Sequence, residues 1–147
     1  LPISALHGFQ VENVLQWIKT KLPEHPPFFD KTDLSDKNER FFASEMIREK
    51  IFMNYKKEIP YSCEVSVEEF KEEEDIIRMR AEIYVERDSQ KKIVIGHRGE
   101  ALKRVGTAAR KDMEKFFMKK VFLEMHVKVD KDWRSNPLKL KKYGYLN

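Results

Sequence analysis

The chain has 147 residues, and 41% of them are hydrophobic and 37% charged. This size fits one domain, or one domain with a piece of another, and the composition excludes a disordered chain. The single cysteine, Cys63, excludes an internal disulfide and a cysteine-based zinc site, and it predicts a reducing, cytosolic compartment. No apolar run approaches the length of about 18 residues that spans a bilayer. Because the sequence begins Leu-Pro-Ile without Met, we expect it to start inside a longer protein.

The net charge of +4 hides an uneven distribution. Residues 64–75 hold seven acidic side chains and one lysine, whereas residues 87–120 hold eleven basic and four acidic side chains, a net charge of +7. A positive block of this density predicts contact with an anionic partner. A solvated helical face with an excess of lysine is the alternative.

Residues 1–22 predict a strand end, a turn at Gly8 and an amphipathic helix. The helix is indicated by apolar residues at helical spacing, namely Val11, Val14, Leu15 and Ile18. Prolines at 23, 26 and 27 end this helix and begin a linker. We therefore expect an N-terminal piece over 1–22, a linker over 23–36 and the main domain over 37–147.

A long helix is expected over residues 37–55, with Asp36 as its N-cap and Glu39 as the reciprocal partner of a capping box. Ile59-Pro60 should end it. Three strands then follow from strict alternation of apolar and polar residues, over 61–68, 77–86 and 121–129. The acidic run 72–75 between the first two suggests a hairpin with a solvated tip, and a divalent-cation site is the alternative.

The stretch between the second and third strands is patterned as helices. A short helix contains Ile93 to Ile95, a second one follows over 101–105, and a longer one starts near Thr107, with Gly106 separating the last two. The order helix, strand, strand, helix, helix, strand predicts an α+β domain with helices on one face of a three-stranded sheet.

Two of the five glycines frame the sequence Gly96-His97-Arg98-Gly99 between two helices. Glycine allows backbone conformations that a Cβ resists, and a helix N-terminus favours an anion. The motif alone also fits an ordinary helix connection. Its place between strands two and three, after Ile-Val-Ile and at the head of the positive block, favours the G-x-x-G clamp by which KH domains hold about four nucleotides.

Residues 83–112 resemble the signature of the Era family of bacterial ribosome-assembly GTPases. The similarity extends to Glu39-Arg40-Phe41-Phe42, Ile47-Arg48-Glu49-Lys50, Glu58-Ile59-Pro60-Tyr61-Ser62, Val127-Lys128-Val129 and Trp133-Arg134. It covers residues 36 to 145 and implies a type II KH fold, with a mixed sheet, that binds single-stranded RNA near the 3′ end of small-subunit ribosomal RNA. It also implies a cytoplasmic monomer that acts with the small ribosomal subunit in its assembly.

The expected RNA site is a groove between the 93–105 helix pair and the second strand. Gly96 and Gly99 would hold the RNA backbone with His97 at the tip, and an apolar floor would meet the bases through Ile93 and Ile95. The phosphates would meet four basic residues: Lys92, Arg98, Lys103 and Arg104. Four further lysines could contact the RNA or simply be solvated: Lys111, Lys115, Lys119 and Lys120.

Ile3-Ser4-Ala5-Leu6 is similar to the last guanine-recognition motif of these GTPases, so Ser4 and Ala5 would be its remnant. The sequence contains no G-x-x-x-x-G-K-[ST], no D-x-x-G and no N-K-x-D. We therefore expect no GTP or Mg²⁺ site and no GTPase activity in this chain, and assign them to the parent protein. No catalytic residue is expected.

Other site types have little support in the sequence. His7, His25, His97 and His126 show no metal-ligand spacing. Trp17 and Trp133 suit helix packing and anchoring of the C-terminal tail better than base stacking. A protein-interaction or membrane-surface module that uses the basic helical face is the alternative function, and it leaves peripheral attachment to the inner face of the cell membrane open.

Overall fold

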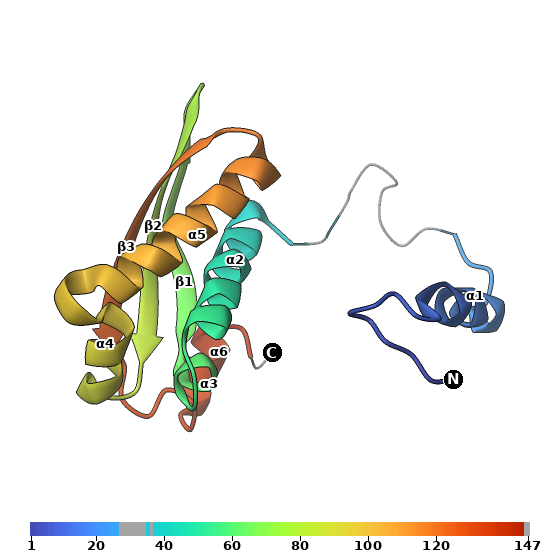
Figure 1. Ribbon diagram of the computed structural model, residues 1–147, viewed down its shortest axis with the longest axis horizontal. Coiled ribbons are helices and arrows are strands. Elements are labelled where there is room, and N and C mark those ends of the chain that lie inside the picture. The colour runs from blue at the N-terminus through green and yellow to red at the C-terminus, as the bar shows by residue number, and fades with distance from the viewer. Residues whose placement is uncertain (27–34, 36, 146–147) are drawn as a thin grey trace. The chain divides into compact units, whose positions relative to one another are not determined.

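The computed structural model describes residues 1–26, 35 and 37–145 (Figure 1). Its contacts divide the chain into two compact units, Leu1–Asp36 and Lys37–Asn147. We describe each unit by itself.

The first unit contains a closed loop and one helix. Ser4 and Phe9 exchange two backbone hydrogen bonds of 3.2 and 3.1 Å, and Gly8 takes a positive φ of 66° between them. The helix α1 (Val11–Lys21) follows, as its apolar spacing predicted. No residue of α1 is buried, and Trp17 keeps 57% of its surface exposed. Its apolar stripe is therefore unpaired within the part of the chain that the structure describes.

The second unit holds a three-stranded mixed sheet and most of the helices. Its elements are α2 (Glu39–Asn54), α3 (Ile59–Ser62), β1 (Glu64–Glu72), β2 (Ile76–Val85), α4 (Asp88–Ile95), a 3₁₀ turn (His97–Gly99), α5 (Glu100–Phe117), β3 (Lys120–Val129) and α6 (Pro137–Lys142). The strand order is β1-β2-β3, with β1 antiparallel and β3 parallel to β2. The acidic run forms the exposed turn of the β1–β2 hairpin, as expected.

The core lies between the sheet and the helices α2 and α5, which cover the same face (Figure 1). The inner stripe of α2 supplies Ala43, Ile47 and Ile51, and that of α5 supplies Val105, Ala109 and Met113. Alternate residues of β2, from Ile77 to Val85, face them. These side chains are at most 2% exposed. The apolar residues that alternate along the strand and those that recur every 3.6 residues along the helices therefore pack into one buried layer. The predicted α+β class with helices on one face is confirmed.

Three predicted boundaries shift. Helix α2 begins at Glu39, because Asn38 is its N-cap and its side chain accepts the Phe41 N–H at 3.0 Å; the predicted cap, Asp36, lies outside the described residues. Ile59-Pro60 opens the separate short helix α3, since proline is tolerated in a first helical turn. Strand β1 therefore starts at Glu64 and runs to Glu72.

Gly106 does not separate two helices, contrary to the sequence prediction. Helix α5 is continuous from Glu100 to Phe117. A Cβ on Gly106 would lie 2.5 Å from the Cε of Met125 on β3. A contact with another strand, which local sequence does not reveal, therefore accounts for this glycine.

The C-terminal tail is bound to the segment where α3 ends and β1 begins. Trp133 is 3% exposed and its indole N–H donates to the Ser62 carbonyl at 3.4 Å. The hydroxyl of Tyr145 donates to the Glu64 carboxylate at 2.5 Å, which Arg48 also approaches. Burial raises the pKa of Glu64, although the Tyr145 hydrogen bond and the positive charge of Arg48 oppose the shift. The predicted anchoring role of Trp133 is confirmed.

Candidate nucleic-acid interface

The Gly96–Gly99 loop has a backbone that needs both glycines. Gly96 has φ 73°, and a Cβ there would lie 2.6 Å from the Cβ of Ala101. Gly99 has φ 80° and Arg98, between them, has φ 48°. A compact turn is closed by a 3.3 Å hydrogen bond from the Gly99 N–H to the Gly96 carbonyl. His97 and Arg98 are exposed, so the loop presents backbone and two polar side chains to solvent.

The loop leads directly into α5. Gly99 is the N-cap of α5 and no side chain caps the helix. The first N–H groups of a helix have no intrahelical acceptor, and the helix dipole adds positive potential there. The turn and helix start together offer backbone donors to an anion.

Tyr55, the C-cap of α2, anchors the end of α4, which leads into the Gly96–Gly99 loop. Its hydroxyl donates to the Val94 carbonyl of α4 at 2.7 Å, and Val94 is fully buried. Val94 lies in the last turn of α4, where carbonyl groups lack helical partners. Burial raises the pKa of Tyr55, so it stays a neutral donor. This link joins two segments 39 residues apart.

A hollow of about 320 Å³ lies beside the loop, between α5 and β3. We call it the loop-side hollow. Helix α5 lines it with Gly99, Leu102, Lys103, Gly106, Thr107 and Arg110, and β3 lines it with Leu123 and Met125. The third strand forms this wall, not the second strand that the sequence analysis named. The reason is the strand order, because β2 is central and β3 is the edge strand beside α5.

The structure brings some of the predicted site residues together and separates others. Gly99 and Lys103 line the loop-side hollow. Arg104 lies on the outer face of α5, where it lines a separate depression together with Lys103 and Lys111. Lys92 and Ile93 are exposed on α4, whereas Ile95 packs against the core and is only partly exposed. Ile95 is therefore a poorer candidate for an apolar floor than Ile93.

The sequence analysis did not select six of the residues that line the hollow: Leu102, Gly106, Thr107, Arg110, Leu123 and Met125. Two signals were available. Leu102, Gly106 and Arg110 recur every four residues, and so share one face of a helix. Leu123 and Met125 alternate on the inward face of the third strand. What the sequence lacked was the pairing of that helix face with that strand.

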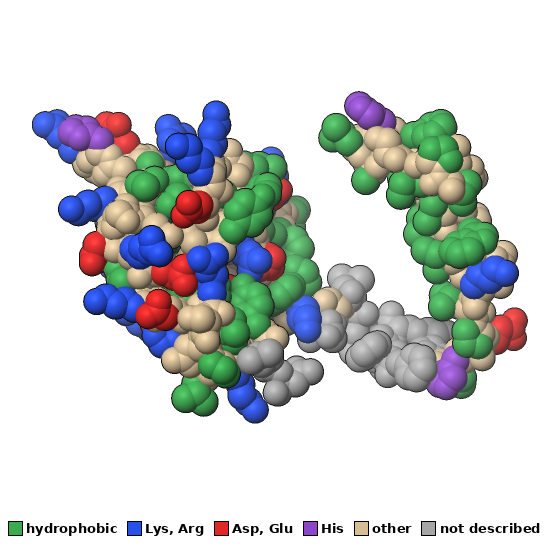
Figure 2. All heavy atoms as spheres, turned by 90° about the horizontal axis from the view of Figure 1, so that it is seen from below, with side chains coloured by type: hydrophobic (Ala, Val, Ile, Leu, Met, Phe, Trp, Pro, Cys, Tyr) green, Lys and Arg blue, Asp and Glu red, His purple; other side chains and the backbone are tan. Residues whose placement is uncertain are grey.

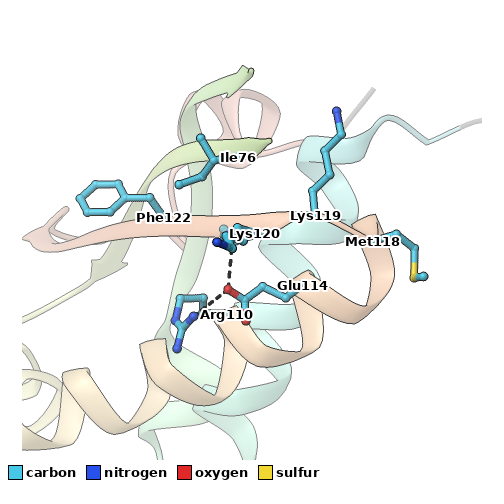
Figure 3. Close-up of a pocket in the computed structure, with 8 residues that line it drawn as sticks. Ile76, Arg110, Glu114, Met118, Lys119, Lys120 and Phe122 are labelled. Carbon is cyan, nitrogen blue, oxygen red and sulfur yellow. Dashed lines mark hydrogen bonds and ion pairs between the residues drawn. The ribbon is translucent and has the colours of Figure 1, made fainter. Parts of the chain in front are cut away.

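A second hollow, of about 680 Å³, lies at the other end of α5 (Figure 3). We call it the far hollow. Its Glu114 carboxylate accepts from Arg110 at 2.6 Å and from the Val121 N–H at 3.3 Å. Lys119 pairs with Glu72 of β1 at 2.5 Å. Ile76, Met118 and Phe122 supply apolar surface.

Basic side chains around the loop are unpaired, whereas at the far hollow Arg110 and Lys119 are paired and, among the described residues, only Lys120 is not. Among the described residues, no ion pair includes Lys92, Arg98, Lys103, Arg104 or Lys111. Lys and Arg side chains are spread over the face of the larger unit that Figure 2 shows, with Asp and Glu between them. Unpaired cations next to backbone donors suit a polyanion.

Neither a metal-ligand cluster nor a membrane-spanning helix occurs among the described residues. No group of three or more His, Cys, Asp or Glu suited to a metal ion occurs among them. No helix within the described ranges has the length and apolarity to cross a membrane. Ser4 and Ala5 lie in the closed loop of the first unit, where the Ser4 hydroxyl accepts the His7 N–H at 3.3 Å.

A model of the KH domain family matches residues 58–134, which contain the loop, both flanking helices and all three strands. The chain belongs to the KH domain family. This KH chain is 49% identical over 147 residues to the GTPase Era of Syntrophus aciditrophicus, covering 99% of itself and 48% of that protein. It is also 49% identical over 148 residues to a chloroplastic ERA-like GTPase of Arabidopsis thaliana, covering 99% of itself and 34% of that protein.

A solved structure of Era in complex with MgGDPNP and nucleotides 1506–1542 of 16S ribosomal RNA has the same fold. The TM-score is 0.93 at 35% sequence identity, over 100% of this chain and 50% of the other. The resemblance to the Era family is thereby confirmed. The chain spans about half the length of the bacterial relative and about a third of the chloroplast one.

Proposed function

We propose that this chain is the RNA-binding KH domain of an Era-like GTPase and binds single-stranded RNA near the 3′ end of small-subunit ribosomal RNA. The observation that carries the proposal is the Gly96–Gly99 turn, which opens an uncapped helix beside an apolar hollow and unpaired cations. It is supported by the solved Era complex, which contains 16S ribosomal RNA. The proposed role is in assembly of the small ribosomal subunit.

The proposed binding mode follows from the geometry. A phosphate approaches the start of α5, where no side chain caps the helix, and meets N–H groups other than those of Gly96, Gly99 and Glu100, which already bond backbone carbonyls. Arg98 and Lys103 add charge from the two sides. The bases then lie in the loop-side hollow, against Leu102, Leu123 and Met125. Strand β3 is an edge strand, so its outer backbone groups can hydrogen-bond to base edges.

GTP binding and hydrolysis belong, in this proposal, to the rest of the parent protein. The relatives are GTPases, and this sequence lacks the phosphate-binding motifs of such enzymes. We propose that residues 1–22 are the last part of the GTPase domain, with Ser4 and Ala5 from its guanine-recognition loop, and that 23–36 is the linker. The exposed apolar stripe of α1 agrees with a helix that has lost its partner.

The test is to replace His97 and Arg98 together with Asp. Both side chains are exposed, so the free energy of unfolding should change by about 0.5 kcal/mol or less. RNA binding should be lost, because two acids would repel the phosphates and offset the positive potential at the start of α5. The affinity is measured by fluorescence anisotropy, at several salt concentrations, with an RNA that corresponds to nucleotides 1506–1542 of 16S ribosomal RNA. Wild-type affinity should fall with salt, with a slope of about −0.7 per phosphate neutralised.

The matched control is Lys56→Asp with Lys57→Asp, which inverts two exposed charges after α2. It should reduce binding far less than the loop variant. A loop variant that folds normally and binds this RNA as tightly as wild type contradicts the clamp. Binding of wild type to phosphatidylserine vesicles, with none to RNA, would favour the membrane-surface alternative.

A further inference from the structure

Gly106 occupies an interior position of α5 where glycine is unfavourable. Glycine destabilises a helix interior relative to alanine. The helix is continuous through it, and Gly106 is not among the residues with positive φ, so no glycine-only backbone conformation accounts for its presence. The reason must lie in the space around it.

That space is filled by a side chain from another element. A Cβ on Gly106 would lie 2.5 Å from the Cε and 3.7 Å from the Sδ of Met125. The terminal methyl of Met125 therefore lies too close for a Cβ to be added at position 106 unless one of them moves. On the core side of the helix, Val105 and Ala109 are fully buried, so a displaced methyl finds no room there.

The neighbouring open volume is the loop-side hollow. Gly106 and Met125 both line it, together with Leu102 and Leu123. Methionine is flexible, so its end can swing into this hollow when a Cβ is added. The hollow would then become shallower without loss of the helix.

We propose that Gly106 sets the depth of the pocket for one nucleobase by letting Met125 lie flat against α5. Met125, Leu102 and Leu123 then form an apolar floor on which the face of the base packs. Gly99 borders the same hollow, so this base belongs to the nucleotide next to the phosphate held by the loop. Gly106 is a positioning residue that acts through Met125. The inference rests on the proposed RNA-binding function and adds a determinant to it.

The first test is Gly106→Ala in the 147-residue chain. The melting temperature should stay level or rise by a few degrees, because alanine favours the helix and the displaced atoms end a flexible side chain. Affinity for the RNA of nucleotides 1506–1542 should fall about tenfold, because the base loses apolar contact area with the floor of the hollow. The salt slope should not change, because no phosphate contact is lost.

The second test is rescue. In Gly106→Ala/Met125→Val the side chain at 125 ends before the clash and keeps an apolar floor, so most of the lost affinity should return. Ser44→Ala is the control, since it favours helix α2 away from the hollow and should leave affinity unchanged. Met125→Phe fills the hollow from the strand and should weaken binding even if Gly106→Ala fails to fold.

The outcomes separate the two proposals. Wild type that binds no RNA refutes the proposed function itself. Wild type that binds RNA, with Gly106→Ala or Met125→Phe folding and binding equally well, overturns the role of the hollow and leaves the loop clamp standing. A double variant that folds but recovers nothing shows that displacement of Met125 is not the cause.

Discussion

The two hollows along α5 and β3 contain similar residue types but differ in how their charges are used. Both combine apolar side chains from helix and strand with lysine and arginine, and Arg110 borders both. At the far hollow, two of the three cations, Arg110 and Lys119, are neutralised by Glu114 and Glu72, and Lys120 is in no ion pair among the described residues. At the loop-side hollow, Lys103 has no acidic partner among the described residues. The volume of a hollow therefore says less about a ligand than the pairing of the charges around it.

The far end of α5 and the end of α4, just before the loop, are also fastened differently. At the far end, Glu114 ties the helix to β3 through the Val121 N–H and so uses an ionised group. At the loop end, the neutral hydroxyl of Tyr55 holds the Val94 carbonyl. Because the Tyr55 anchor carries no charge, it does not neutralise the cations near the loop, and they stay available to a ligand. The comparison can be tested by altering each anchor and each set of charges.

The largest expected effect is at the neutral anchor. Tyr55→Phe keeps the ring but leaves the Val94 carbonyl without its donor, so the free energy of unfolding should fall by roughly 1–3 kcal/mol. Urea denaturation measures it. Tyr61→Phe is the control, because the Tyr61 ring is exposed and its hydroxyl makes no hydrogen bond within the described residues. Equal stability of the two variants would show that the Tyr55 bond does not hold the loop.

The second prediction compares equal charge reversals at the two hollows. Lys103→Glu should weaken RNA binding about tenfold or more and reduce the salt slope by about 0.7, because an unpaired cation is replaced by an acid. Lys119→Glu, which loses only a cation already paired with Glu72, should have a much smaller effect. Anisotropy titrations over a range of salt test both. Equal losses would mean that overall charge, and not pairing, controls binding.

Glu82 of β2 is buried and, like Glu114 at the far hollow, pairs with a cation, and this ion pair should make stability depend on pH. The pKa of Glu82 is lowered by hydrogen bonds from Lys128 and Tyr84. A lowered folded-state pKa stabilises the protein above the unfolded value of about 4.3, and this contribution is lost as pH falls through the folded value. Glu82→Gln should therefore lower the free energy of unfolding at pH 7 by about 1 kcal/mol, because the Gln oxygen still accepts a hydrogen bond from Lys128 or Tyr84 and only the charge is lost.

The difference between wild type and Glu82→Gln should shrink as the pH falls below about 4. Chemical denaturation at pH 7, 5 and 3 measures this, with Glu74→Gln at the exposed hairpin turn as the control. A difference that persists unchanged at pH 3 would assign the loss to altered packing and not to the ion pair.

The smallest expected effect is a gain. Glu114→Gln keeps an oxygen for the Val121 N–H but weakens the hold on Arg110, which also borders the loop-side hollow. RNA affinity should rise about twofold at low salt. Glu73→Gln adds the same unit of charge and releases Arg78 instead, so it should give a smaller gain. If both variants gain the same RNA affinity, the change in net charge alone accounts for the effect.

The sequence predicted the strands and most helices because each has one face in the core. The period-2 alternation placed the second strand at 77–86, and the structure has β2 at Ile76–Val85. Gly106 misled the prediction, since glycine usually interrupts a helix, and only the contact with Met125 explains it. A close approach between segments that are distant in sequence leaves no local signal.

The candidate site was predicted less completely than the fold. The Gly96–Gly99 turn stood out because its composition is unusual and local. The opposite wall was assigned to the second strand because chain order does not say which strand is central. Strand order fixes that wall as β3, and with it Leu123 and Met125. Ile95 was chosen for its hydrophobicity, but α4 turns it toward the core.

The β-bulge in β1 has a consequence for how the β1–β2 hairpin tolerates change. The strand register shifts between Val67 and Glu69, and the Arg40 guanidinium bonds the carbonyls of Val67 and Glu68 at 3.0 and 2.9 Å. These two hydrogen bonds attach the middle of the hairpin to the start of α2. The outer half ends in an exposed acidic turn (Figure 1). Residues inserted into that turn should therefore lengthen the hairpin outward without changing which side chains face the core.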